Sequence, residues 1–342
     1  MELESLMEES IKTLEKDFYD KKFYLSYSSL NKLIWNPAVF YQHYVLGLKE
    51  EKQEAHLVQG KIIHALLLEP DKFEENFIVS EDNLPTGNLK AVIDRVFSHH
   101  RELLKNGDER KLLGEFTDAI LDIMKDMNYH QSLKTDGQRL DKAITQETQN
   151  YWSFLQNKGG KTLIDKESYE FCKNAVEIIK TNQNICNLIG CNINDFDNKE
   201  VFNEIPLQID ASNRIFGIKG IIDNLVIDND KKIIYINDIK TTSKDLKDFP
   251  ETVEFYSYWM QAVIYCTLVS MKYQNLIANG YEIKFHFIVI DRMFQSYAFP
   301  VKEDTLMGWL DKLNGALDKA EWHFIRRSFD LPYEFATGLV SL

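Results

Sequence analysis

The chain has 342 residues, 44% of them hydrophobic and 12% aromatic, which excludes a disordered protein and predicts two domains or one domain with a large insertion. The formal net charge of −13 argues against a nucleic-acid binder that is basic over its whole surface, but not against an enzyme with a local binding groove. No apolar run reaches the ~18 residues of a membrane span, the start is not that of a signal peptide, and the four scattered cysteines form no disulfide framework, so we expect a reduced, cytoplasmic protein without a membrane partner.

The N-terminal part of the chain is predicted to be helical. Residues 1–22 are rich in Glu and Asp and predict an acidic leader, helical or frayed. Three short helices are expected over residues 23–80: one capped by Ser26 or Ser28 and broken at Asn36-Pro37, one over 40–46 ended by Gly47, and one over 60–68 ended by Pro70. Among the aromatic residues here, Trp35, Phe40 and Tyr41 could stack on a frayed nucleic-acid strand, but we expect core packing.

The pattern changes near residue 196. Residues 81–195 show helical periodicity and no strand pairs, and we predict a helical insertion there. Residues 196–342 predict an α/β unit with the following elements in order: strands at 201–209, 215–227 and 232–239, a helix around 258–268, a strand at 284–290 and a helix at 304–324. The fold class is therefore α/β.

Two acidic residues and a lysine lie on the predicted hairpin of the second and third strands. With Asn229-Asp230 as the turn, Asp223 lies opposite Ile236 and Asp238 opposite Ile221, so Asp223, Asp238 and Lys240 share one face of the sheet. Paired carboxylates suit Mg²⁺, and a nearby lysine can orient a water or stabilise charge on a phosphate. The alternative is a solvated hairpin surface, although Asp238 stands in an apolar strand where an unpaired carboxylate is costly.

These residues resemble the active-site motifs of the PD-(D/E)XK nucleases, in particular the RecB and RecE-like exonuclease branch, to which exodeoxyribonuclease VIII belongs. The stretch GIIDNLVIDNDKKIIYINDIKTT is similar to the active-site hairpin, and Gln261-x-x-x-Tyr265 to a helix that follows it. Gly60-x-x-x-His64 is similar to an upstream histidine helix, and Glu204 matches the strand glutamate before the hairpin. Alone, His64 could equally be a core histidine and Glu204 a surface residue.

The resemblance implies a restriction-endonuclease-like core, a central mixed β-sheet flanked by helices, with a large helical insertion. It implies that His64, Asp223, Asp238 and the Ile239 backbone carbonyl hold Mg²⁺, for which Mn²⁺ substitutes. Glu204 is a further candidate residue of the site. Lys240 would position the attacking water, and Gln261 and Tyr265 the scissile phosphate or the lysine. Iron–sulfur members have a cysteine before the proline where this chain has Asn36, so no iron–sulfur cluster is expected.

The expected function is a metal-dependent DNA exonuclease that hydrolyses linear duplex DNA from its ends for recombination or repair, in a phage-type pathway beside a single-strand annealing protein. The host cytoplasm is then its location, and a homo-oligomer is compatible. A structure-specific endonuclease or nickase on the same core, and an inactive DNA-binding or assembly module, are the alternatives.

Overall fold

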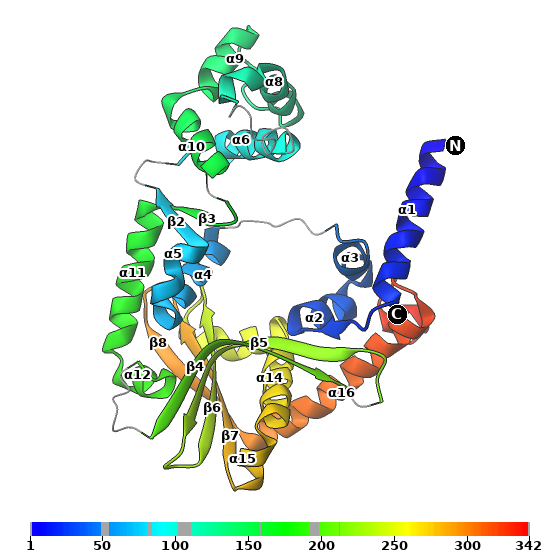
Figure 1. Cartoon of the computed structure of the whole chain (residues 1–342), viewed down its shortest axis with the longest axis vertical. Coiled ribbons are helices and arrows are strands. Elements are labelled where there is room, and N and C mark those ends of the chain that lie inside the picture. The colour runs from blue at the N-terminus through cyan, green and yellow to red at the C-terminus, as the bar shows by residue number, and fades with distance from the viewer. Residues whose placement is uncertain are drawn as a thin grey trace. The chain divides into compact units, whose positions relative to one another are not determined.

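A computed structural model describes residues 2–48, 55–80, 84–101, 111–157, 159–191, 198–211 and 213–340. The chain folds as two compact units, one made of residues 1–64 and 176–342 and the other of residues 65–175 (Figure 1). Within the described residues, no helix combines the length and the apolar character that crossing a membrane requires.

The first unit is built on a six-stranded mixed sheet. Its strands follow the order β1–β5–β6–β7–β8, and β4 also pairs with β5. The β1–β5 and β6–β7 pairs are parallel, whereas β4–β5, β5–β6 and β7–β8 are antiparallel. The strands are β1 (Tyr24–Leu25), β4 (Lys199–Asp210), β5 (Gly217–Asp228), β6 (Ile233–Thr241), β7 (Glu282–Ile290) and β8 (Ser296–Val301). The predicted fold class, a central mixed sheet flanked by helices, is confirmed.

The other elements of this unit are helices. They are α1 (Glu2–Tyr19), α2 (Tyr27–Trp35), α3 (Pro37–Phe40), α4 (Ala55–Leu68), α11 (Lys166–Thr181), α12 (Gln183–Ile189), α13 (Phe249–Phe255), α14 (Tyr258–Lys272), α15 (Gln274–Ala278), α16 (Glu303–Arg326) and α17 (Tyr333–Ala336), of which α4 and α11 continue into the second unit. The helices α13, α14 and α15 connect β6 to β7, the crossover that parallel neighbours require. Helix α14 packs into the main core with Ala262, Ile264 and Leu268, together with Ile236 and Phe285 of the sheet.

The segment after Asn36-Pro37 differs from its prediction. The predicted helix over 40–46 is the short α3 followed by one π-helical turn, Tyr41–Val45. Phe40 is fully buried and Tyr41 half-buried, as expected for core packing, but Trp35 is 67% exposed and its core prediction is wrong. Trp35 is the last residue of α2, and burial on this helix ends with Leu33, so the ring projects beyond the core.

A row of buried amides crosses the sheet. The Asn224 side-chain amide donates to Asn203 Oδ1 (2.8 Å), and the Asn237 amide donates to Asn224 Oδ1 (2.7 Å). The same amides donate to the carbonyls of Ile189 and Leu188 in α12, at 3.0 and 2.9 Å. The Asn203–Asn224 and Asn224–Asn237 pairs are also direct cross-strand neighbours, so this amide row ties β4, β5 and β6 together at one level.

The second unit is mostly helical. Its helices are α5 (Phe73–Asn76), α6 (Gly87–His99), α8 (Thr117–Asp126), α9 (Asp136–Ala143) and α10 (Gln146–Asn157), and a core around Trp152, Ile93 and Ile120 holds α6, α8 and α10 together. Within the described part of 81–195 one strand was not predicted: β3 (Thr162–Asp165), which pairs in parallel with β2 (Phe77–Ser80), a strand that precedes this segment. Four residues are too few to show a period of two against helical flanks.

Candidate active site

The β5–β6 hairpin sets the two predicted aspartates side by side. Asp228 pairs with Ile233 and Asn224 with Asn237, so the predicted register, with Asp223 opposite Ile236, is wrong by two residues. The connection spans residues 229–232 rather than a two-residue turn, and it is held by Asp228 Oδ1, which accepts the Lys231 N–H at 3.0 Å. Because the error is an even number of residues, Asp223 and Asp238 keep the same relative orientation.

Glu204 on β4 lies beside Asp223 in the sheet. Its neighbours Asn203 and Ile205 pair with Asn224 and Ile222, so Glu204 falls opposite Asp223. Its φ is +50°, a left-handed conformation inside a strand that costs a residue with a side chain about 1–3 kcal/mol. The surrounding strand pairing holds Glu204 in this conformation, which directs its carboxylate toward His64.

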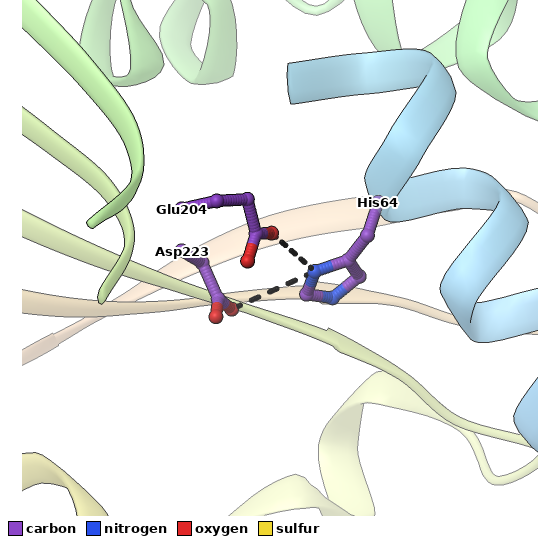
Figure 2. A group of neighbouring side chains, drawn as sticks. All are labelled: His64, Glu204 and Asp223. Carbon is purple, nitrogen blue, oxygen red and sulfur yellow. Dashed lines mark ion pairs between the residues drawn. The ribbon is translucent and has the colours of Figure 1, made fainter. Parts of the chain in front are cut away.

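His64 on α4 completes a three-residue group (Figure 2). Its Nδ1 lies 3.7 Å from Glu204 Oε1 and 3.9 Å from Asp223 Oδ2, while its Nε2 lies 2.9 Å from the Ile239 carbonyl. A carbonyl can only accept, so Nε2 carries the hydrogen and Nδ1 faces the carboxylates. Burial lowers the pKa of His64, but Glu204 and Asp223 together outweigh it, so the pKa is raised.

Asp223 connects this group to β6. It is 9% exposed, and its Oδ2 accepts the Ile239 N–H at 2.8 Å. Burial raises the pKa of Asp223, although His64 and Lys240 both act to lower it. Among the described residues, the side-chain ligand atoms of His64, Glu204 and Asp223 lie within 4.8 Å of one another.

Asp238 and Lys240 form a buried ion pair beside this group. Lys240 Nζ contacts Asp238 Oδ2, and the Asp238 side chain is fully buried. Burial raises the pKa of Asp238, while Lys240 lowers it. Asp238 therefore lies on the strand next to Asp223 but directs one oxygen to the lysine, and its Oδ1 has no hydrogen-bond partner among the described residues.

Gln261 and Tyr265 lie one turn apart on α14. Gln261 Nε2 donates to the Tyr265 hydroxyl at 2.9 Å, and Gln261 Oε1 is buried without a partner among the described residues. Tyr265 approaches β5 closely at Gly220, where a Cβ atom would lie 2.7 Å from the tyrosine ring. Both side chains line a pocket of about 660 Å³ together with Ser28 and Lys219.

The sequence analysis did not single out Tyr258, whose ring centroid lies 5.0 Å from Lys240 Nζ. Its spacing was the available signal, because Tyr258 precedes Gln261 by three residues and shares a helix face with it. The aromatic ring covers the aliphatic and ammonium parts of the lysine and restricts where the ammonium can point.

The chain is similar to a known protein family and to several solved structures. The family model of the PD-(D/E)XK nuclease superfamily matches residues 24–314. The chain belongs to this superfamily. No curated protein matches the chain. Eight chains of solved structures do, among them a crystal structure named "Putative exonuclease" from Eubacterium rectale, which is 11% identical, has a TM-score of 0.43, and is aligned over 93% of the nuclease and 83% of that chain.

The donor set of the nuclease suits a hard divalent cation. It offers carboxylate oxygens from Glu204 and Asp223 and one imidazole nitrogen from His64, at a partly buried site. The His64 Nε2–H bond to a backbone carbonyl fixes the ring orientation in the way that metal-ligating histidines commonly require. The residues present therefore fit a bound divalent metal ion.

Proposed function

We propose that this nuclease is a metal-dependent deoxyribonuclease of the RecE-like type, an exonuclease that degrades linear duplex DNA from its ends. The observation that supports it is the His64–Glu204–Asp223 group beside the buried Asp238–Lys240 pair. Its expected context is the processing of DNA ends in recombination or repair, in the cytoplasm, as in a phage-type pathway with a single-strand annealing protein.

Mg²⁺ is the expected ion, with Mn²⁺ as a substitute. His64, Glu204 and Asp223 would hold it, joined by Asp238, whose Oδ1 is buried and unpartnered among the described residues. The Ile239 carbonyl, expected from the sequence as a further ligand, instead accepts the His64 Nε2–H on the side of the ring away from Nδ1. When bound, the ion supplies Lewis acidity to the scissile phosphate and lowers the pKa of water at the site.

The other residues act on the substrate directly. Lys240 carries a fixed positive charge into a buried site, where it can orient the attacking water and stabilise the negative charge that develops on the phosphate. Asp238 holds the lysine ammonium in place, and the Tyr258 ring limits its motion. Tyr265 receives a hydrogen bond from Gln261, so its own hydroxyl hydrogen is available to a phosphate oxygen.

The decisive experiment compares linear duplex DNA, labelled at one end, with covalently closed circular DNA of the same sequence. We expect degradation of the linear DNA to short products in Mg²⁺ or Mn²⁺, no reaction in EDTA, and survival of the circle. Lys240→Ala should be inactive, whereas the same substitution at the half-exposed Lys284 of β7 should be active.

Other results would contradict the proposal in different ways. Nicking of the circle would indicate a structure-specific endonuclease. Binding without cleavage in either metal would indicate an inactive DNA-binding module. Degradation of both substrates would retain the metal site but remove the requirement for an end.

A further inference from the structure

Three large aromatic side chains at the C-terminal ends of α2 and α13 are exposed to solvent. Phe255 is 73%, Trp35 67% and Tyr256 45% exposed. Phe255 ends α13, Tyr256 follows it in the connection to α14, and Trp35 ends α2. We call these three residues the aromatic platform. An exposed patch of large apolar rings is uncommon enough to indicate a binding surface.

Ring contacts connect the platform to Lys240. The Tyr258 ring lies 5.0 Å from Lys240 Nζ, and the Tyr256 ring stacks on Tyr258 with a centroid distance of 5.5 Å and an interplanar angle of 26°. Phe255 then meets Tyr256 edge-on at 4.9 Å. A series of ring contacts thus leads from the buried Lys240 outward to the most exposed ring, so a ligand on the platform would also reach the active site.

Helix α2 fixes the platform from the other side. The Tyr27 hydroxyl donates to the Tyr256 carbonyl at 2.6 Å, and the Asn31 side-chain amide donates to the same carbonyl at 3.5 Å. Trp35 follows Asn31 by four residues, and therefore lies one turn further on the same side of α2. The rings are consequently presented by two anchored elements and need little reordering to bind.

A lysine lies against the platform, where it can meet a ligand that combines flat rings with negative charge. Lys244 Nζ lies 5.8 Å from the centre of the Phe255 ring. The adjacent Glu254 is paired with Lys312 at 3.3 Å, which reduces its repulsion of phosphates. Aromatic rings beside lysines are the usual means by which proteins bind unpaired nucleotides, because every base has a face that can stack.

We propose that the aromatic platform stacks the unpaired bases of a single-stranded tail or frayed end next to the bond that is cut. The proposal rests on the proposed function, since it takes DNA as the substrate. It predicts a nuclease that binds tailed or frayed ends better than blunt ones, with base stacking and not only phosphate charge supplying the difference.

The test separates stacking from charge by comparing two tails. Duplexes carrying a short thymidine tail or an abasic tail of equal length have the same phosphates but differ in bases. In EDTA, which prevents cleavage, we expect the full-length protein to bind the thymidine tail about tenfold more tightly than the abasic tail, which is about 1.4 kcal/mol. Phe255→Ala and Trp35→Ala should each reduce this preference to about twofold.

Matched variants make the test specific. Phe255→Trp keeps an aromatic face and should keep the preference. Phe335→Ala removes another largely exposed ring, 58% exposed on α17, and should not alter it. Equal affinities of the wild-type protein for the two tails would overturn the proposal without the use of any variant. So would an unchanged preference in both alanine variants, which is also the result expected if the platform binds a partner protein.

Failure of this proposal can be distinguished from failure of the proposed function. A protein that shows the base-dependent preference but cleaves no DNA would retain the platform and refute the exonuclease. A protein that degrades linear duplexes, but whose alanine variants bind both tails as the wild type does, would retain the exonuclease and refute the platform.

Discussion

The Asp223 carboxylate contacts two other parts of the site, the backbone of β6 and the His64 side chain. Its Oδ2 accepts the Ile239 N–H and lies 3.9 Å from His64 Nδ1, so one oxygen both ties β5 to β6 and faces the imidazole. The carboxylate therefore has two roles. An amide oxygen could also accept the Ile239 N–H, but it could not supply the negative charge that faces His64. A substitution at Asp223 can separate these two roles.

We expect Asp223→Asn to lower the cleavage rate at least about a hundredfold, because the site loses a negative ligand for the metal ion. The melting temperature should stay equal or rise, since the asparagine oxygen can accept the Ile239 N–H and the cost of burying a charged carboxylate, which raises the pKa of Asp223, is removed. Cleavage assays and thermal melts in EDTA measure the two effects.

Asp228→Asn on the same strand is the control. Asp228 pairs with Lys199 and Lys231 at the hairpin end, so its substitution should lower stability by about 1–3 kcal/mol and leave cleavage at a permissive temperature unchanged. An active Asp223→Asn protein would place the metal site elsewhere.

The sequence motifs predicted which residues lie near one another more accurately than which pairs of side chains make contact. His64, Glu204 and Asp223 lie together, Glu204 and Asp223 because their strands pair and His64 because α4 brings it to the same place. The pairing of Asp238 with Lys240 was not foreseen, because it depends on which rotamers a buried cavity allows. The same limit applies to Trp35, since hydropathy cannot tell an aromatic residue at the exposed end of a helix from one in the core.

Among the elements, α4 positions His64 through a close contact one turn earlier. A Cβ atom on Gly60 would lie only 3.0 Å from Thr241 Oγ1 at the end of β6. Gly60 and His64 are four residues apart and share a helix face, so the glycine lets the helix approach the strand that carries Ile239. The Gly-x-x-x-His spacing thus has a packing reason in addition to a chemical one.

We expect Gly60→Val to weaken Mn²⁺ binding roughly tenfold, because the added side chain pushes α4 away from β6 and moves His64 from Glu204 and Asp223. Calorimetric titration with Mn²⁺ measures the effect. Gly114→Val, at a glycine with no atom within 4 Å of its would-be Cβ, is the comparison and should bind normally. Equal affinities in the two variants would show that α4 is not held by this contact.

The strands were predicted more accurately than the way they pair. The four long strands lie within two residues of their predicted limits, since Ile and Val runs between turn residues are a strong signal. The short strands β1, β2, β3 and β8 were missed, because their stability comes from neighbouring strands and not from their own sequence. The hairpin register failed because the turn has four residues and not two.

For the whole molecule, protonation of one buried histidine on β7 should lower the free energy of unfolding in acid. His286 on β7 is 9% exposed, and its Nδ1 has no hydrogen-bond partner among the described residues. Burial, and to a lesser extent the charge of Lys284, lower the pKa of His286 to about 4. The unfolded chain takes up this proton near pH 6.5, whereas the folded protein resists it until about pH 4.

The stability linked to His286 should therefore be complete above pH 6.5 and be lost as the pH falls toward 4, by up to about 3 kcal/mol. His286→Phe, which cannot titrate, should lose less stability over this interval than the wild type. Denaturant unfolding at several pH values measures both proteins. Parallel curves of unfolding free energy against pH would contradict the prediction.

The amide row across β4, β5 and β6 bears on how the folding chain selects one pairing of its strands. A slip of one residue turns apolar side chains outward and is rejected by hydrophobicity, but a slip of two restores the alternation and escapes that penalty. The chain itself meets this ambiguity during folding. A displaced hairpin would leave Asn224 and Asn237 buried without each other and without the α12 carbonyls, a loss that an apolar strand would not incur. Buried polarity of this kind lowers the stability of misaligned competitors more than it raises that of the native sheet, and it keeps the carboxylates of adjacent strands at the same level.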